Sequence, residues 1–273
     1  MTWNPTPLAP VSPGARTSLT DAAAAAPAGL PKRDELDRWH ADAGQRLDAL
    51  QSALYAEGKR AVLVVLQGRD ASGKDGTIRR VFGPLNPQGF SVTSFKAPTP
   101  IELAHDFLWR AHLAVPAKGT IGVFNRSHYE DVLVVRVRRL APESVWRPRY
   151  QQINEFERLL TGNGVTILKF LLHISREEQR ERLLARLDDP AKYWKFAPGD
   201  LDDRKRWDEY SEAFEEMLER TSTDEAPWYV VPADKKHVRD VLVAATVLDA
   251  VGRLNPKYPG PPPGVEALRK ALG

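Results

Sequence analysis

With 273 residues and a net charge of +3, from 39 Lys and Arg against 36 Asp and Glu, the chain can build one large domain with short extensions. No apolar run approaches the ~20 residues that span a bilayer, and without cysteine there are no disulfides or thiolate metal sites. The alanine run 22–26 is too short, and too soon followed by Pro27, for a secretion signal. A soluble, cytoplasmic protein without a membrane partner is therefore expected, in which local clusters of arginine could hold a polyanion.

The chain begins with a segment unlike the rest. Residues 1–31 are rich in Pro, Ala, Ser and Thr without amphipathic period, so we expect a flexible or extended arm. Leucines at helical spacing then predict a helix over 34–58. The apolar run AVLVVLQG (61–68) predicts a strand buried on both faces, as at the centre of a parallel sheet.

Strand and helix patterns alternate along the remainder. Further strands are predicted at 90–98, 119–127, 165–175 and 228–233. Helices are predicted at 100–114, 144–160, 177–187, up to about 220, and 235–254. This order predicts an α/β fold with a parallel five-stranded sheet covered by helices on both faces. The domain is expected over 32–256, followed by a Pro-rich tail over 257–273.

A phosphate-binding loop is predicted directly after the first strand. The segment GRDASGKDG (68–76) satisfies GxxxxGK and lies between a buried strand and a helix beginning near Lys74, the context that this motif requires. Loop N–H groups and the lysine would hold phosphate, although an ordinary strand–helix turn is the alternative. The predicted phosphate-binding residues are Gly68, Arg69, Ala71, Ser72, Gly73, Lys74, Asp75, Arg79 and Arg80.

Acidic residues in this loop indicate a metal ion. Asp75 replaces the Ser or Thr that usually follows the lysine, and Asp70 lies inside the loop. A bare carboxylate would repel phosphate, but Mg²⁺ or Mn²⁺ between them would reverse this, since Mg²⁺ is held by one or two carboxylates plus phosphates. We therefore predict Asp70 as a metal ligand, with a loop-capping role as the alternative.

The third strand ends in FNRSHYED (124–131). Asn125 stands where such enzymes commonly carry a metal-binding acid, and Arg126 could fork onto phosphate oxygens. A plain strand-end turn at Asn125 is the alternative. Glu130 and Asp131 are expected to open a helix, where the dipole alone favours acids.

Two clusters of basic residues follow. The segment 176–206 lies where small-molecule P-loop kinases carry an arginine-bearing lid, with a solvated, salt-bridged helix face as the alternative. The second cluster suggests a long anionic substrate and consists of Arg136, Arg138, Arg139, Arg147 and Arg149.

These segments resemble the polyphosphate kinase 2 family from about residue 33 to 254. The motifs that carry the resemblance are GRDASGKDGTIRRV, VFNRSHYEDVLVVRV, INEFERLL, KFLLHISREEQRERLLARLDDPAKYWKF and TSTDEAPWYVVPADKKHVRDV. The resemblance implies a P-loop fold, Mg²⁺, a lid, and phosphate transfer between inorganic polyphosphate and nucleotides. The catalytic residues that it implies are Asp70, Lys74, Asn125, Arg126, Arg182 and Arg186.

Acceptor choice is the finer implication of the resemblance. The family often has Asp in place of Asn125 and Asn in place of Glu130, and the FNRSHYED form is similar to the subgroup that phosphorylates both AMP and ADP. Lys96, Arg126 and Glu130 are the predicted acceptor residues. GMP or GDP as further acceptors and a homo-oligomer, dimer or tetramer, are also expected. The alternatives are an ATP-dependent P-loop kinase and a nucleic-acid-binding module, of which the second leaves the acidic phosphate loop unexplained.

Overall fold

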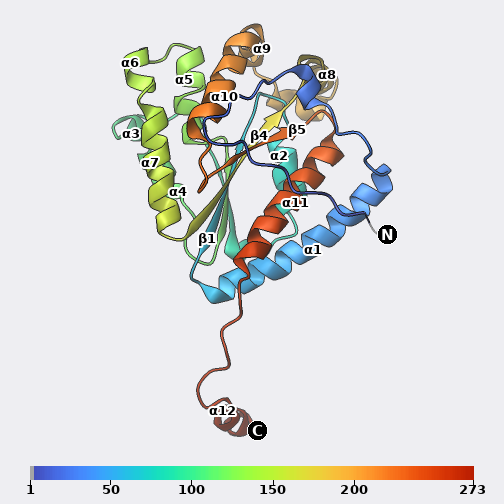
Figure 1. The fold of residues 1–273 in the computed structure, drawn as a ribbon, viewed down its shortest axis with the longest axis vertical. Helices are drawn as coiled ribbons and strands as arrows, with labels where there is room; N and C mark the ends of the chain where they lie inside the picture. The colour runs from blue at the N-terminus through green and yellow to red at the C-terminus, as the bar shows by residue number, and fades with distance from the viewer. Residues whose placement is uncertain (1–2) are drawn as a thin grey trace.

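A parallel five-stranded sheet forms the centre of the computed structural model, which describes residues 3–273 (Figure 1). Its strands are β1 (Ala61–Gln67), β2 (Phe90–Ser94), β3 (Ile121–Asn125), β4 (Val165–His173) and β5 (Trp228–Pro232). The order across the sheet is β2-β3-β1-β4-β5, and every neighbouring pair is parallel. The predicted α/β fold class is confirmed.

The central strand β1 is buried over all seven residues, as its apolar run predicted. Because successive side chains of a strand point to opposite faces, it contributes to two cores. Val62, Val64 and Leu66 belong to the core on one face of the sheet. Leu63 and Val65 belong to the core on the other.

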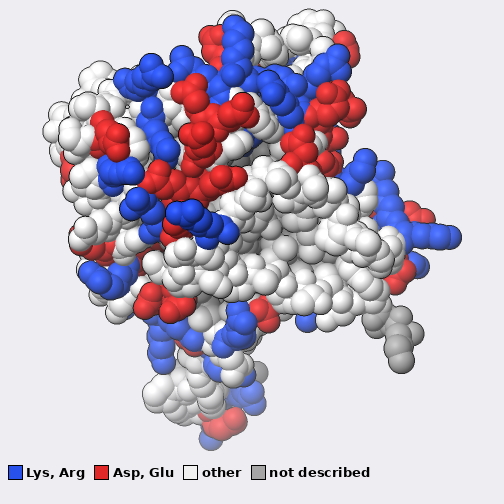
Figure 2. Space-filling view, turned by 45° about the horizontal axis from the view of Figure 1, so that its top comes forward, with Lys and Arg blue, Asp and Glu red and all other residues white. Residues whose placement is uncertain are grey.

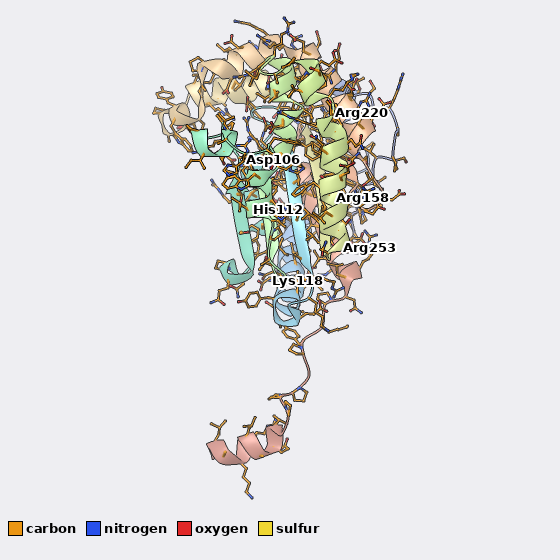
Figure 3. The ribbon with its side chains drawn as sticks, turned by 90° about the vertical axis from the view of Figure 1, so that its left-hand side faces the viewer. Asp106, His112, Lys118, Arg158, Arg220 and Arg253 are labelled. Atoms are coloured by element: carbon orange, nitrogen blue, oxygen red, sulfur yellow. The ribbon has the colours of Figure 1, made fainter. Side chains whose placement is uncertain are left out.

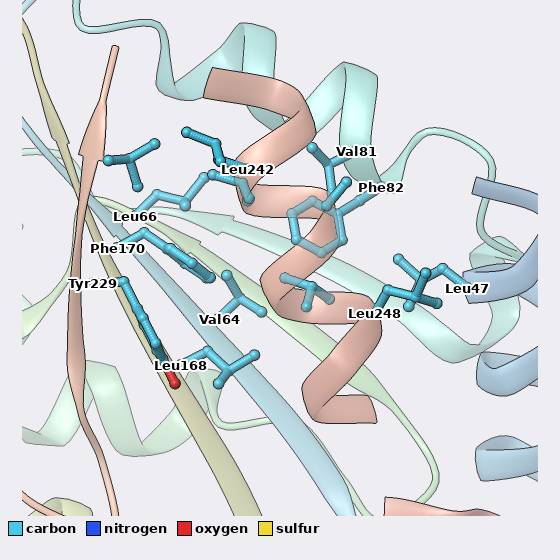
Figure 4. Close-up of a cluster of buried hydrophobic side chains, with 14 of the residues drawn as sticks. Leu47, Val64, Leu66, Val81, Phe82, Leu168, Phe170, Tyr229, Leu242 and Leu248 are labelled. Atoms are coloured by element: carbon cyan, nitrogen blue, oxygen red, sulfur yellow. The ribbon is translucent and has the colours of Figure 1, made fainter. Parts of the chain in front are cut away.

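The first core lies under α1 (Arg33–Glu57), α11 (Lys236–Leu254) and a π-helical turn, η2 (Ile78–Phe82). Figure 4 shows strand residues such as Phe170 facing Leu242 and Leu248 of α11. Burying such side chains contributes about 1.5–3 kcal/mol each. This packing fixes the short helix α2 (Lys74–Thr77), which runs directly into η2.

The second core lies under α7 (Arg149–Gly162) and α10 (Trp207–Thr221), with α4 (Trp109–Ala114) and α5 (Val134–Val137) beside them. Figure 3 shows this side of the molecule, with Arg158 of α7 and Arg220 of α10 labelled. Inside this core the ammonium of Lys169 lies 2.5 Å from Glu157, and neither side chain reaches solvent. Lys169 also donates to the Thr221 carbonyl, which anchors β4 to the end of α10.

Two predicted helices are interrupted. The helix predicted over 100–114 is divided into α3 (Pro100–Leu103) and α4. The division lies at Asp106, whose side chain accepts a hydrogen bond from the Leu108 N–H and starts a new turn. The helix predicted over 144–160 is α6 (Glu143–Trp146) and α7, divided at Pro148, whose missing N–H cannot continue a helix. The expected helix at Glu130 and Asp131 is one 3₁₀ turn, η4 (His128–Asp131).

The arm, residues 3–31, lies extended against the domain. The Val11 N–H donates to the Trp228 carbonyl of β5, and the Leu19 N–H donates to Glu215 of α10. Leu19 is buried, as is Ala24 of the 3₁₀ turn η1 (Asp21–Ala24). The arm is thus in contact with β5 and α10, which isolated apolar residues without a period did not indicate in the sequence, and its flexibility stays a prediction.

The tail contains a helix that the sequence did not predict. After the Pro-rich segment, α12 (Val265–Leu272) projects from the domain, and none of its residues is buried (Figures 1 and 3). The division of the chain into arm, domain and tail stays a prediction. No helix within residues 3–273 is both long and apolar enough to cross a membrane.

Candidate functional site

The loop between β1 and α2 has a backbone that requires glycine at both ends. Gly68 has φ +149°, and a Cβ there would lie 2.6 Å from the Leu172 carbonyl oxygen. Gly73 has φ +104°, and a Cβ there would overlap the Arg239 guanidinium. Side chains at either position would move the loop, so the GxxxxGK spacing reflects a real backbone constraint.

Lys74 curls back over this loop. Its ammonium donates to the carbonyls of Gly68, at 2.7 Å, and Arg69, at 3.2 Å. Burial lowers the pKa of Lys74 to about 8, and the charge of Arg126 acts in the same direction. The ammonium of Lys74 therefore lies against the loop and loses its proton at a lower pH than the ammonium of an ordinary lysine.

The ends of β1 and β3 meet through an ion pair. Arg126 lies just past β3, with φ +59°, and its Nη2 is 2.5 Å from Oδ1 of Asp70. Its Nη1 is 3.5 Å from Oε2 of Glu130. Although burial lowers the pKa of Arg126, the carboxylates of Glu130 and Asp70 raise it. The structure thus brings together three residues that the sequence predicted for one site.

Oxygen donors for a divalent ion lie next to this pair. The Asn125 amide donates to Oδ1 of Asp75 at 2.8 Å, so these two side chains are aligned across the strand ends. Across residues 3–273, no group of three or more His, Asp or Glu side chains gathers as in an all-protein metal site. Asp70 and Asp75 suit a Mg²⁺ ion that completes its shell with phosphate oxygens and water.

A groove of about 1130 Å³ runs over this loop at the carboxyl ends of the strands. Figure 2 shows Lys, Arg, Asp and Glu side chains crowded over this part of the molecule. Eleven cations line the groove against five acids, which favours a polyanion. The cations are Lys74, Arg79, Arg80, Lys96, Arg126, Arg182, Arg186, Lys192, Lys195, Lys236 and Arg239.

The predicted lid corresponds to three short helices: α8 (Arg176–Leu187), the 3₁₀ turn η5 (Pro190–Lys195) and α9 (Pro198–Lys205). Arg186 at the end of α8 donates to the Lys195 carbonyl at 3.0 Å and lies 3.3 Å from Asp200. This arginine holds the lid segments together and also borders the groove.

Arg182, which was predicted as a lid residue, is held by hydrogen bonds to backbone carbonyls of the domain. Its Nη1 donates to the carbonyls of Ala71 and Ser72, at 2.9 and 3.0 Å. Its Nη2 donates to those of Ala233 and Asp234, at 2.6 and 2.9 Å. The guanidinium therefore fastens the phosphate loop to the end of β5.

Arg69 does not direct its side chain into the groove. Its guanidinium lies 3.7 Å from the centroid of the Trp207 ring and donates to Ser211 at 2.6 Å. Burial lowers the pKa of Arg69 to about 10. The predicted phosphate contact of Arg69 is thus limited to its backbone, because the side chain anchors the loop to α10.

The second basic cluster lies outside the groove. Arg136 lies 2.7 Å from Glu216, Arg138 lies 2.7 Å from Asp203, and Arg149 lies 2.9 Å from Asp131. The expectation that this cluster marks a long-substrate path is not supported by its placement outside the groove, and these three guanidinium groups are paired with carboxylates.

Two cations of the groove were not predicted from the sequence. Lys236 and Arg239 come from the first turns of α11, and Arg239 donates to the Ser72 carbonyl at 3.2 Å. Cations at a helix N-terminus oppose the helix dipole. The run KKHVR at the start of a predicted helix was therefore the available signal.

Known proteins resemble this chain closely. The family model described as "Polyphosphate kinase 2 (PPK2)" matches residues 31–259. A Meiothermus ruber protein named AMP/ADP-polyphosphate phosphotransferase is 56% identical over 224 residues, covering 82% of this chain and 84% of its own. A Rhodopseudomonas palustris protein named ADP-polyphosphate phosphotransferase is 46% identical over 240 residues, covering 84% and 82%. The crystal structure of polyphosphate kinase 2 from Arthrobacter aurescens is similar at 44% identity and a TM-score of 0.88, covering 92% of this chain and 90% of its own.

Proposed function

The chain belongs to the polyphosphate kinase 2 family, and from this premise we propose that it transfers a terminal phosphoryl group reversibly between inorganic polyphosphate and AMP or ADP. A relative named for both acceptors, 56% identical, supports the pair of acceptors. The observation that carries the proposal is the groove, in which a phosphate loop, Asp70 and Arg126 lie together among cations.

In the proposed reaction, a terminal phosphate oxygen of the acceptor attacks the terminal phosphorus of polyphosphate in line. A new P–O bond forms while the bond from that phosphorus to its bridging oxygen breaks, and the shortened polyphosphate leaves with the electron pair. The attacking oxygen is ionised near neutral pH, so no strong base is needed. Catalysis then depends on positioning and on charge neutralisation.

Residues of the loop and of the surrounding groove have separate parts in this scheme. The loop N–H groups and Lys74 would hold the phosphates, and Arg126 would exchange its contact with Asp70 for phosphate oxygens. Asp70 and Asp75, which both line the groove, would hold Mg²⁺ or Mn²⁺, and the metal ion would supply further neutralisation of phosphate charge. Arg186 would help to keep water out by holding the lid segments over the groove.

The proposal is tested by product analysis. The protein is incubated with AMP, ADP, GMP or GDP, long-chain polyphosphate and Mg²⁺, and the nucleotides are followed chromatographically. ATP and ADP should appear from polyphosphate and not from the nucleotide alone. Transfer that requires ATP as donor would favour the ATP-dependent kinase, and salt-sensitive polyanion binding without transfer would favour a nucleic-acid-binding module.

Two broader expectations accompany the proposal. A cytoplasmic location stays a prediction, in keeping with a sequence that contains no cysteine. A homo-oligomer, dimer or tetramer, stays a prediction that light scattering of the purified protein checks.

A further inference from the structure

Trp194 is an exposed aromatic residue inside an otherwise charged groove. It lies in η5 and lines the groove beside Lys192 and Lys195, yet it is 77% exposed. The cations around it suit phosphate, whereas an indole offers them no counter-charge. A ligand with both a phosphate part and a flat aromatic part would use both kinds of lining residue.

The groove has one other aromatic lining residue, Phe95, among the residues that the structure describes. Phe95 is only 6% exposed, packs against Phe124 at a ring-centroid distance of 4.8 Å, and carries the Arg110 guanidinium 5.4 Å from its ring. Its ring is therefore already covered. Trp194 supplies the aromatic surface in the groove that is open to a ligand.

The orientation of Trp194 leaves a ring face free. Its Nε1–H donates to the Ala191 carbonyl at 3.0 Å, which satisfies the polar edge and fixes the ring. The Lys195 ammonium lies 5.0 Å from the ring centroid, and with 77% of the residue exposed, ring surface away from this cation is open to solvent. Bases stack on such faces whatever their hydrogen-bonding pattern.

We propose that Trp194 is the stacking platform for the base of the acceptor nucleotide, an inference that rests on the proposed function. Phosphates would then lie over the loop and the base would lie on the lid segment η5. Since stacking is tolerant of base identity, this contact predicts that guanine nucleotides are accepted as well as adenine nucleotides.

The test compares Trp194→Ala and Trp194→Phe with the wild-type protein. Trp194→Ala should raise KM for ADP, and Kd for ADP measured calorimetrically without donor, by roughly ten- to hundredfold. KM for polyphosphate should stay within about twofold, because the donor has no base to stack. Trp194→Phe keeps a ring and should recover most of the affinity. It should lose the part of the tryptophan fluorescence quenching that ADP stacked on Trp194 is expected to cause in the wild-type protein.

Tyr193→Ala is the matched control, since Tyr193 is also exposed in η5 but does not line the groove. Equal losses in both alanine variants, an equal rise in KM for both substrates, or an unchanged Kd for ADP would each overturn the stacking role. So would a change in oligomeric state of Trp194→Ala, which would assign the ring to an interface. ADP binding by calorimetry tests the platform even if the wild-type protein transfers no phosphate from polyphosphate, a result that would instead overturn the proposed function.

Discussion

Arg126 and Asp70 lie 2.5 Å apart, Nη2 to Oδ1, although 56 positions of sequence separate them. From the sequence, Asp70 was predicted to bind a metal ion and Arg126 to bind phosphate, and these two ligands have opposite charges. In the structure each neutralises the other. An incoming metal ion would take the place of Arg126 at Asp70, and phosphate would take the place of Asp70 at Arg126, so neither charge is left without a partner when substrate binds.

Asp70→Asn should nearly abolish transfer, with kcat lowered by at least about a hundredfold, because the change removes the carboxylate proposed to hold the metal ion. The remaining activity should depend weakly on Mg²⁺ concentration, and the melting temperature should change little. Asp202→Asn, an exposed acid outside the groove, is the control. Near-normal turnover of Asp70→Asn would reduce Asp70 to a loop cap.

Lys74→Ala should lower turnover by at least about a hundredfold, since preorganised charge near a transferring phosphate typically contributes a few kcal/mol. The measurement is steady-state kinetics with both substrates varied. Weaker binding with preserved turnover would show instead that Lys74 stabilises ground state and transition state equally.

The lowered pKa of Lys74 predicts two pH effects. Because the protonated form is needed, kcat/KM should fall as the pH rises through about 8, the value for the free enzyme. An unfolded lysine keeps its proton to about pH 10.5, so between these values the unfolded state binds more protons and the free energy of unfolding rises with pH. The check is denaturant unfolding of the wild-type protein and of Lys74→Met from pH 7 to 10. If the free energies of unfolding of the two proteins changed with pH in parallel, the prediction would be contradicted.

Arg182 and Arg186 should separate into two roles. Arg182→Ala should lower the free energy of unfolding by about 3 kcal/mol, because partly buried carbonyls of the loop and of the β5 end lose a charged donor. Arg186→Ala should lower it by less than about 1 kcal/mol, yet reduce turnover if the lid excludes water. Urea unfolding and kinetics on both variants decide this, and equal stability losses would contradict the assignment.

The cations of the groove should determine how KM for polyphosphate depends on the length of the polyphosphate chain. Replacing Arg79 and Lys236 by Gln should raise KM for long polyphosphate roughly tenfold, and for tripolyphosphate less. The salt dependence of KM should also weaken, since fewer ion contacts are screened. The double variant with Gln at Arg139 and Arg147 is the control outside the groove. If the control shows the larger effect, the long-substrate path follows the second basic cluster.

Glu130→Asn should depress AMP phosphorylation several-fold more than ADP phosphorylation. Glu130 lies 3.5 Å from Arg126 and so helps to set the position of that guanidinium. AMP is one phosphate shorter, so its reacting oxygen must sit deeper, where small misplacement is costly. Parallel kinetics with both acceptors test this, and an equal change for both would leave Glu130 as a helix-start acid.

The sequence by itself determined the fold class, the loop and the residues at the strand ends. A fully apolar β1, strands separated by helices, and GxxxxGK after a buried strand are local patterns, and parallel strands place their carboxyl ends at one edge. The proximity of Asp70, Lys74 and Arg126 followed from that rule, because each lies just past the end of β1 or β3.

Only the tertiary structure decided which charges are free. Arg69, Arg136 and Arg182 looked like phosphate ligands in the sequence, but each is bound to groups far along the chain. Arg239 belongs to a predicted helix, and only the structure shows that its guanidinium donates to the Ser72 carbonyl of the phosphate loop. A charged side chain pairs with whatever three-dimensional packing brings within ~4 Å, and no local pattern records that distance.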